Sequence, residues 1–267
     1  MKIAILGLGK MGESLVEGLR LSQQSKKILI KATTRSKESA KLGQKKLKIA
    51  VLTDNKKAIQ DAQVVILCVK PHQAEQVLSE ISSHLKSSQL LISVCASITT
   101  SQIESWTNHA CNVIRAMPNT PAVLKEAMTV LCLGAECKPT HLKTAEMIFK
   151  SVGKTAVVEE DLMDGVTGLS GCGPAYVYLM IEALSEAGVK VGLSRETSTL
   201  LAAQTLLGAS KMVLERGDHP AALKDEVTTP AGCTIDGLMA LEEGKLRVTL
   251  IKAVLAAAQK SQRLREM

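Results

Sequence analysis

A short apolar run at the start of the chain leads directly into three regularly spaced glycines. Residues 3–6 read Ile-Ala-Ile-Leu, and Gly7, Gly9 and Gly12 follow in the order Gly-x-Gly-x-x-Gly. Such a run is typical of a strand buried on both faces of a parallel sheet, and residues 13–21 then have helical periodicity. The order predicts a dinucleotide-binding turn. Gly7 permits the tight turn, Gly9 lets the backbone approach a pyrophosphate, and Gly12 lets helix and strand pack closely.

The rest of the chain divides into two patterns. Further apolar runs occur at 28–30, 64–69, 90–94 and 112–115, and they alternate with helical segments. This alternation predicts an α/β fold with an N-terminal Rossmann-like doubly wound parallel sheet. Three long segments with apolar residues at three- and four-residue steps follow at 174–191, 194–216 and 246–264, and Gly188, Gly192 and Gly217 fall where these helices are expected to end. We therefore predict a Rossmann domain over 1–158 and an all-helical dimerisation and substrate domain over 159–267.

Composition argues against several classes of protein. The net charge of +7 is spread in short clusters, and with one Trp, two Tyr and one Phe the chain offers few stacking aromatics, so a nucleic-acid binder is not expected. The seven cysteines form no Cys-x-x-Cys pair, which argues against a disulfide framework and against a zinc or other metal site. No apolar run reaches 18 residues, and the N-terminus does not match a signal peptide. We expect a cytoplasmic protein that does not bind membranes.

The end of the second predicted strand bears on the choice of cofactor. A site for NAD usually has an acidic residue here to accept a hydrogen bond from the ribose 2′-hydroxyl. This chain has Thr33, Thr34, Arg35 and Ser36 and no acid. Arginine and hydroxyl groups suit a 2′-phosphate, so NADPH is the expected cofactor and NADH a possible one. The alternative is that Arg35 is an ordinary solvated loop charge.

Other strand ends are expected to complete the cofactor site, because ligands of α/β sheets bind at the carboxyl ends of the strands. His72, which follows Lys-Pro, could be catalytic, but we favour a helix cap. The candidate cofactor-binding residues are Gly7, Leu8, Gly9, Lys10, Met11, Thr34, Arg35, Ser36, Asn55, Val69, Lys70, Pro71, Cys95 and Asn119.

A polar tract at 225–238 offers a second possible anion site. Pro230 ends the preceding segment, Gly232 allows close backbone approach, and Thr234 can cap a helix that begins near Ile235. The N–H groups and dipole at a helix N-terminus favour a small carboxylate. An ordinary helix-capping loop is the alternative.

The start of the helical half leaves two interpretations open. Gly171 and Gly173 permit close approach, and Pro174 suits the first turn of a helix. The segment could serve close helix packing or lie near the nicotinamide. The Ala- and Leu-rich helices that follow would expose an apolar face in a monomer, so a homodimer is expected.

Having these motifs, the chain resembles the pyrroline-5-carboxylate reductase family almost from end to end. The resemblance rests on the glycine turn, Val69-Lys-Pro-His72, Arg115-Ala-Met-Pro-Asn-Thr-Pro121, Leu169-Ser-Gly-Cys-Gly-Pro-Ala-Tyr176, Leu223-Lys-Asp-Glu226 and Val227-Thr-Thr-Pro-Ala-Gly-Cys-Thr234. It implies NAD(P)H-dependent reduction of the C=N bond of 1-pyrroline-5-carboxylate to L-proline, the last step of proline biosynthesis.

The resemblance also implies roles for particular residues. The substrate carboxylate would be held by the backbone of Ala231, Gly232, Cys233 and Thr234, with Thr229 nearby, and the Thr234 hydroxyl would be the catalytic contact to the ring nitrogen. The family forms dimers through intertwined helical domains, with each active site drawing on both chains, and often assembles five dimers into a decamer.

Several positions depart from the family pattern. Ala231 and Cys233 stand where Gly and Thr or Ala are common, Cys172 replaces a frequent Ser, and Cys95-Ala-Ser97 replaces a run of small residues. Ala231 matters most, because alanine would be strained if that position needs a positive φ.

Two other function classes fit the sequence less well. A β-hydroxyacid dehydrogenase would place a catalytic lysine about one turn into the helix after Gly171-Cys-Gly173, but residues 174–180 contain none. A non-catalytic cofactor-binding module would not need the Thr229–Thr234 loop. The imine chemistry fits a site without a strong acid, because a cyclic imine is basic enough to be protonated, or nearly so, on binding, which leaves the protein to position it.

Overall fold

The computed structural model describes residues 1–22 and 25–266, and the chain forms two compact units. The first unit contains Met1–Cys172 and the chain from Ala256 onward, and the second contains Gly173–Leu255. The division between the units falls later than the predicted boundary at 158/159, because Met163 is fully buried against Val130 and Cys132 of the sheet. The last turns of the chain also return to the first unit. The domain limits given from the sequence stay predictions.

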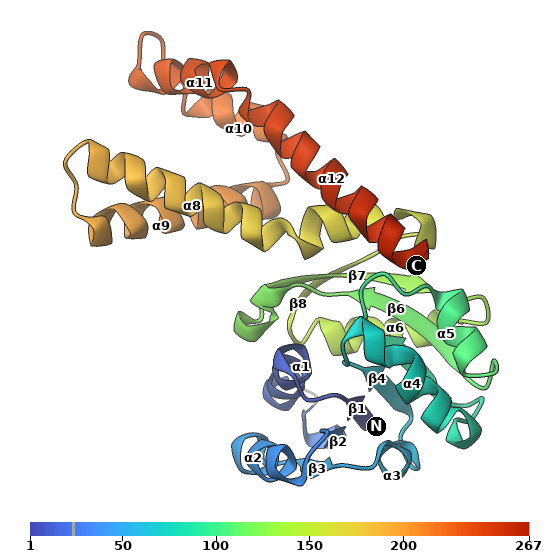
Figure 1. Ribbon diagram of the computed structural model, residues 1–267. Helices are drawn as coiled ribbons and strands as arrows, with labels where there is room; N and C mark the ends of the chain where they lie inside the picture. Colours follow the sequence, from blue (N-terminus) through green and yellow to red (C-terminus); the bar gives the residue numbers. More distant parts are fainter. Residues whose placement is uncertain (23–24, 267) are drawn as a thin grey trace. The chain divides into compact units, whose positions relative to one another are not determined.

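An eight-stranded sheet forms the centre of the first unit (Figure 1). Its strand order is β3-β2-β1-β4-β5-β6-β7-β8. The strands are β1 (Lys2–Leu6), β2 (Leu29–Thr33), β3 (Ala50–Leu52), β4 (Val64–Leu67), β5 (Leu90–Ser93), β6 (Asn112–Met117), β7 (Ala127–Leu133) and β8 (Gly153–Val157). All neighbouring pairs are parallel except β6 and β7. The short connection between those two, through the 3₁₀ turn η3 (Thr120–Leu124), has no room for the crossover that a parallel pair requires.

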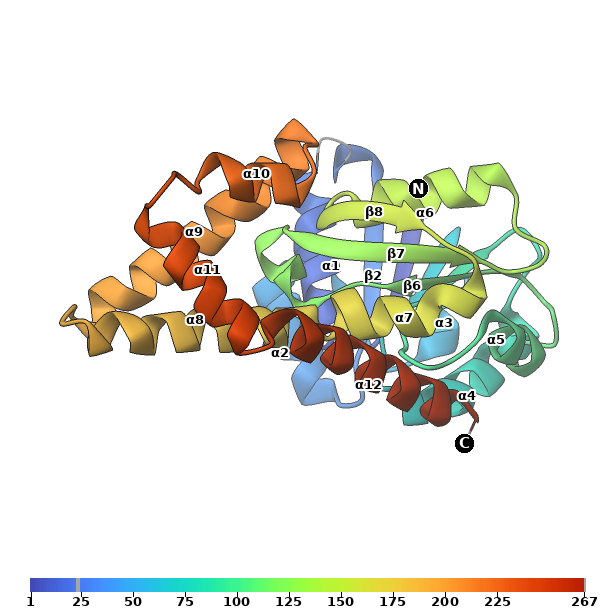
Figure 2. The same ribbon diagram turned by 90° about the horizontal axis from the view of Figure 1, so that it is seen from above.

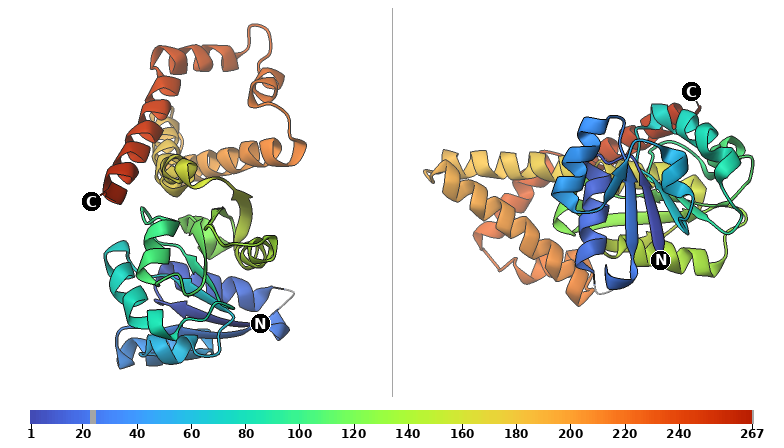
Figure 3. Two further views of the ribbon diagram at one scale, coloured as in Figure 1. Left: turned by 90° about the vertical axis from the view of Figure 1, so that its right-hand side faces the viewer. Right: turned by 90° about the horizontal axis from the view of Figure 1, so that it is seen from below.

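Helices cover both faces of this sheet, which confirms the doubly wound prediction (Figure 3). The helices are α1 (Lys10–Leu21), α2 (Lys37–Leu47), α3 (Asn55–Ile59), α4 (Pro71–Ile81), α5 (Thr100–Trp106) and α6 (Pro139–Phe149). Ile3 and Ile5 of β1 pack in one core cluster with α1, α2 and α6, whereas Ala4 and Leu6 pack in the other with α3, α4 and α5. Alternate residues of one strand thus enter opposite cores, and both sets are apolar.

A continuous helical segment leads from the sheet to the second unit. It consists of η4 (Glu160–Leu162), α7 (Met163–Val166), the π-helical turn η5 (Thr167–Gly171) and the start of α8 (Gly173–Lys190). Pro174 lies in the first turn of α8, as predicted. A π-helical turn inside a longer helix is rare and frequently marks a functional position.

The second unit is entirely helical, as predicted. It contains α8, α9 (Arg195–Arg216), α10 (Pro220–Glu226), α11 (Cys233–Glu243) and the beginning of α12 (Leu246–Glu266). α8 and α9 form an antiparallel hairpin (Figure 2). Gly192 (φ +99°) and Gly217 (φ +72°) follow helix ends with left-handed backbones, as expected. The prediction for Gly188 was wrong. It lies inside α8, where a β-carbon would come 2.5 Å from Ser198 Oγ of α9.

Few side chains of the second unit are buried. Ser185, Ser198 and Ala202 are the buried residues of α8 and α9. Large apolar side chains are instead exposed along its helices, including Val177, Leu179, Leu184, Leu200, Leu207, Leu214, Met239, Leu241, Val248 and Ile251. An exposed apolar surface of this extent marks an interaction site. Among the described residues, no helix is both long and apolar enough to span a membrane.

Candidate active site

The glycine turn after β1 has the geometry that its spacing predicts. Gly7 has a φ of +96°, and a β-carbon there would lie 2.9 Å from the Cys68 carbonyl oxygen. A β-carbon on Gly12 would lie 2.5 Å from the Gly7 carbonyl oxygen. Gly9 differs, because a β-carbon there would meet no described atom within 4 Å. Two glycines therefore serve close packing, and the third borders open space.

Gly9 is also the N-cap residue of α1. Its backbone is extended (φ −91°, ψ −169°), and within the described part of the chain no side chain caps this helix. The N–H of Glu13 donates to the Gly9 carbonyl at 2.9 Å, so the N–H groups of Lys10, Met11 and Gly12 precede the first intrahelical bond. An uncapped helix N-terminus beside open space fits the pyrophosphate of a nicotinamide dinucleotide. The residues present therefore fit the implied cofactor.

A hydroxyl group at the end of β2 holds this turn, a role that the sequence did not predict for it. Thr33, the last residue of β2, accepts the N–H of Gly7 at 3.3 Å and donates to Asn55 Oδ1 at 2.8 Å. Asn55 Nδ2 donates in turn to Glu80 Oε2 at 3.1 Å. The structure thus brings Gly7 and Asn55 together through Thr33. A hydroxyl residue at the end of β2, paired with Leu6 next to Gly7, is the signal that could have indicated it.

The predicted 2′-phosphate site lies where β2 meets α2. Ser36 is the N-cap residue of α2 and accepts the N–H of Ser39 at 3.1 Å, and Thr34 Oγ1 donates to the Ser36 carbonyl at 3.2 Å. The Arg35 side chain is exposed. A solvent-facing guanidinium at a helix N-terminus is compatible with a phosphate and also with an ordinary surface charge.

A hydrogen bond from a thiol connects the segments that follow β4 and β5. Cys95 is buried, and its Sγ donates to the Val69 carbonyl at 3.3 Å. Burial raises the pKa of the Cys95 thiol to about 11, so the group stays protonated and can donate. Val69 also lines the turn, since a β-carbon on Gly7 would lie 2.9 Å from its Cγ1.

The residues after Val69 start α4. Lys70 is the N-cap residue of that helix, and Pro71 is its first residue. The expectation that His72 caps the helix was wrong. His72 is the second helical residue, and its side chain is exposed. Proline at the first helical position fixes the start of α4 without a capping side chain.

Asn119 has a clear structural function. Its Nδ2 donates to the Ser170 carbonyl in η5 at 3.1 Å, and its Oδ1 accepts the N–H of Met128 at 3.0 Å. The amide therefore ties the π-helical turn to β7. Gly171 in the same turn packs closely on β6, because a β-carbon there would lie 2.6 Å from Met117 Cε. Close packing thus accounts for Gly171, although its partner is a strand.

In the second unit, residues 229–232 form a tight turn before α11. The N–H of Gly232 donates to the Thr229 carbonyl at 3.1 Å, and Ala231 has a φ of +56°. Proline at the second position and a positive φ at the third define a type II turn, which normally places glycine third. The sequence-based concern about Ala231 is confirmed, since alanine occupies the left-handed region here.

The first turn of α11 has no capping side chain within the described part of the chain. The helix begins at Cys233, and Gly232 is its N-cap residue. The prediction that Thr234 caps a helix starting near Ile235 was wrong, because Thr234 is the second residue of α11. A side chain on Gly232 would collide with Thr229 Oγ1. The helix terminus without a capping side chain and the Thr234 hydroxyl therefore lie together in the first turn of α11.

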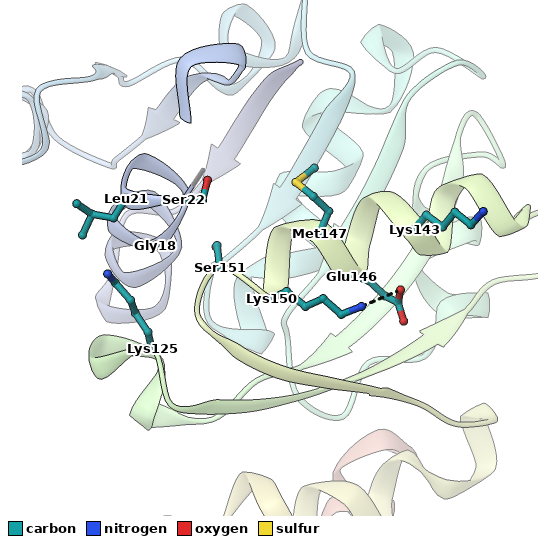
Figure 4. Close-up of a pocket in the computed structure, with 9 residues that line it drawn as sticks. All are labelled: Gly18, Leu21, Ser22, Lys125, Lys143, Glu146, Met147, Lys150 and Ser151. Carbon is teal, nitrogen blue, oxygen red and sulfur yellow. Dashed lines mark hydrogen bonds and ion pairs between the residues drawn. The ribbon is translucent and has the colours of Figure 1, made fainter. Parts of the chain in front are cut away.

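A separate cavity of about 600 Å³ lies elsewhere in the first unit (Figure 4). It is lined by Gly18, Leu21, Ser22, Lys125, Lys143, Glu146, Met147, Lys150 and Ser151. Gly18 and Leu21 belong to the C-terminal end of α1, whereas the glycine turn adjoins its N-terminal end. None of the predicted site residues lines this cavity, so it is distinct from the dinucleotide site.

Comparison with known proteins decides the family. The pyrroline-5-carboxylate reductase of Methanosarcina acetivorans is 41% identical over 98% of this chain and 97% of its own length. The chain belongs to the pyrroline-5-carboxylate reductase family. A family model described as pyrroline-5-carboxylate reductase dimerisation matches residues 160–264, and one described as NADP oxidoreductase coenzyme F420-dependent matches residues 2–97.

Solved pyrroline-5-carboxylate reductases have the same fold. The enzyme from Coxiella burnetii is 36% identical with a TM-score of 0.93 and covers 98% of this chain and 97% of its own. The Plasmodium falciparum enzyme with NADP bound is 34% identical with a TM-score of 0.87, and it covers 99% and 98%. The fold of this chain is therefore that of a nicotinamide-dinucleotide-binding oxidoreductase, and the dimerisation match indicates self-association.

Proposed function

We propose that the chain catalyses the NAD(P)H-dependent reduction of 1-pyrroline-5-carboxylate to L-proline, the last step of proline biosynthesis. The observation that carries the proposal is the uncapped N-terminus of α11 beside Thr234, within a chain whose family and dinucleotide-binding fold are established. A substrate whose carboxylate is attached to the carbon next to the ring nitrogen needs both an anion site and a nearby hydroxyl, and the first turn of α11 offers both.

The substrate carboxylate is proposed to bind at the start of α11. The backbone N–H groups of Cys233 and Thr234 and the dipole of the helix would stabilise it, while the Gly232 N–H donates to the Thr229 carbonyl and holds the turn. Ala231 shapes the turn that exposes these groups, and Thr229 packs against Gly232. The Thr234 hydroxyl, in the second position of the helix, is proposed to hydrogen-bond the ring nitrogen.

The reaction requires a hydride at the imine carbon and a proton on the nitrogen. A bound reduced nicotinamide supplies the hydride. The Thr234 hydroxyl orients the nitrogen and stabilises its proton, while the α11 terminus fixes the carboxylate on the neighbouring ring carbon. Two contacts on one helical turn hold the imine in a single orientation and present its imine carbon to the hydride. The carbon that bears the carboxylate does not react, so an L-configured substrate gives L-proline.

NADPH is proposed as the preferred cofactor. Gly7, Leu8, Gly9, Lys10 and Met11 would hold the pyrophosphate, and Thr34, Arg35 and Ser36 would hold the 2′-phosphate. Support comes from the exposed guanidinium at the α2 terminus and from the absence of an acidic residue in 33–36. Asn55, Val69, Lys70, Pro71, Cys95 and Asn119 are proposed to border the rest of the cofactor.

A homodimer through the second unit is proposed as the functional form, located in the cytoplasm. The exposed apolar side chains of α8, α9 and α12 support pairing with a second copy. A decamer of five dimers is a further proposal that rests on the family resemblance. Light scattering on the purified protein separates these states, since a dimer has twice and a decamer ten times the 28.5 kDa mass of the chain.

The rival oxidoreductase class is not favoured. A β-hydroxyacid dehydrogenase would need a lysine in the first turns of α8, and in that helix lysine occurs only at position 190, the last residue. A non-catalytic cofactor-binding module would not need a carboxylate site at the N-terminus of α11. Both alternatives would leave proline formation at background.

The proposal is tested by incubating the purified chain with 1-pyrroline-5-carboxylate and either NADPH or NADH. We expect cofactor oxidation and stoichiometric proline, with NADPH giving the higher kcat/KM. Proline at background with both cofactors would overturn the proposed reaction, and a higher kcat/KM with NADH would overturn only the cofactor preference.

A further inference from the structure

Two carboxylates on the segment after β8 hold the loop between β5 and α5. Glu160 accepts the backbone N–H of Thr100 at 2.8 Å and also the Thr100 hydroxyl, and it pairs with the buried Arg115 at 3.2 Å. Glu160 therefore fixes the end of the loop at which α5 begins. Asp164, four residues later, acts on the middle of the same loop through a different set of contacts. All of these groups belong to the first unit.

Asp164 reaches the loop through α12. Ser261 Oγ donates to Asp164 Oδ1 at 2.7 Å and lies 3.2 Å from Ser97 Oγ. A hydroxyl has one hydrogen, and that of Ser261 is used toward Asp164, so Ser97 must donate to Ser261. Arg265 Nη1 pairs with the other Asp164 oxygen at 3.3 Å. Ser261 is 3% exposed and Asp164 8% exposed, so the contacts are shielded from water.

Ser97, the loop residue in this series of hydrogen bonds, has an unfavourable backbone conformation. Ser97 has a φ of +58°, in the left-handed region that favours glycine. A serine stays in this conformation only where its surroundings fix it. The bond to Ser261 supplies that constraint.

The loop also forms part of the wall of the dinucleotide site. Cys95, two residues before Ser97, donates to the Val69 carbonyl, and Val69 in turn packs against Gly7. In doubly wound folds, one half of the sheet binds each mononucleotide, and β2 marks the adenosine half here. The loops after β4 and β5 therefore serve the nicotinamide half.

We propose that Ser261 and Asp164 are positioning residues for the cofactor. They touch neither cofactor nor substrate. They hold Ser97 in its left-handed conformation and so keep loop 94–99 in the form that the nicotinamide half requires. The proposal rests on the proposed function only in placing the dinucleotide at the carboxyl ends of these strands.

The test measures dissociation constants of NADPH and NADH by cofactor fluorescence, without any imine substrate. We expect Ser261→Ala to weaken the binding of the preferred dinucleotide about tenfold, because Ser97 loses its acceptor. Adding Ser97→Gly should restore most of that affinity, since glycine adopts a positive φ without the bond. Binding of 2′,5′-ADP, which lacks the nicotinamide half, should change by less than about twofold.

Ser185→Ala is the matched control. It removes an equally buried hydroxyl, bonded at 2.8 Å to Thr199 Oγ1 in the second unit, and should leave dinucleotide binding unchanged. The proposal is overturned if Ser261→Ala binds like the wild type, if glycine at position 97 restores nothing, or if 2′,5′-ADP weakens equally. Ser97→Ala cuts the same bond from the loop side. Should Ser261→Ala fail to fold, an unchanged affinity of Ser97→Ala would equally overturn it.

Discussion

The turn that leads into α1 and the turn that leads into α11 share one design but differ in their foundations. In each turn, a residue with a positive φ precedes a glycine N-cap residue with an extended backbone: Gly7 lies two positions before Gly9, and Ala231 lies one position before Gly232. Neither helix has a capping side chain in the described part of the chain. In the first unit, the turn follows a strand whose residues Ile3 to Leu6 are at most 1% exposed. In the second, the turn joins α10 and α11, neither of which has a buried residue.

This difference separates a preformed site from one that depends on its surroundings. The α1 turn is fixed by the Gly7–Gly12 packing and by the hydrogen bond to Thr33. The α11 turn is fixed by one backbone bond across a strained alanine. Dinucleotide binding should therefore tolerate damage to the second unit, whereas catalysis should respond to it strongly.

The largest expected effect comes from Thr234→Ala. Removing the positioned hydrogen-bond partner of the ring nitrogen should lower kcat by about 10²-fold, while the dissociation constant of NADPH stays within about twofold. Thr228→Ala is the control, because the Thr228 hydroxyl in the same loop donates to the Lys224 carbonyl at 2.8 Å. Parallel losses of turnover and NADPH affinity in Thr234→Ala would reassign the hydroxyl to structure.

Next in size is the contrast between two glycines of the α1 turn. Gly9→Ala places a methyl group in open space, so thermal stability should be kept while dinucleotide affinity falls about tenfold or more. Gly12→Ala should lower both thermal stability and dinucleotide affinity, because the new β-carbon would lie 2.5 Å from the Gly7 carbonyl oxygen. A Gly9→Ala variant that binds NADPH at full strength would contradict the proposed approach of the pyrophosphate.

Arg35→Ala is expected to have a narrower effect. Loss of one charge-assisted contact to a 2′-phosphate should lower kcat/KM with NADPH about tenfold and leave the value with NADH unchanged. Lys41→Ala, an exposed lysine on α2, serves as the control. An unchanged NADPH-to-NADH ratio would mean that Arg35 is an ordinary surface charge.

The smallest expected effect is a gain. Ala231→Gly should stabilise the second unit by about 1 kcal/mol, because glycine adopts the positive φ of the type II turn without a steric penalty. Ala240→Gly inside α11 should lose a similar amount in the same thermal unfolding assay. Equal losses of stability in Ala231→Gly and Ala240→Gly would show that the turn is not strained at position 231.

Sequence reasoning predicted those parts of the fold where burial leaves a continuous signal. β1, β4, β5 and β6 are buried on both faces, so each was evident as an apolar run. β3 is three residues long, and β8 is half exposed, so neither has such a run. β7 is an exception, because Ala127–Leu133 is a mostly buried, mostly apolar run that was not predicted as a strand. Its antiparallel direction depends on the length of a connection that has no apolar pattern.

The same limit applies to the candidate site. The turn and packing roles of Gly7 and Gly12 follow from spacing within one turn and were confirmed. The contact of Thr33 with Gly7 depends on the register between two strands, and the contact of Asp164 with Ser261 joins residues 97 positions apart. The wrong prediction for Thr234 has a local cause. Gly232 is the N-cap residue, so the helix begins at Cys233, two residues earlier than predicted.

The return of α12 to the first unit has a consequence for biosynthesis. Ser261 leaves the ribosome only after the whole second unit has been made, and translation adds roughly 5–20 residues per second. Until then, Asp164 has no hydroxyl partner and Ser97 has no acceptor, although every strand of the sheet is already present. The nascent sheet therefore waits several seconds with loop 94–99 held at Cys95 and Thr100 but not at Ser97, and this loop reaches its final form last.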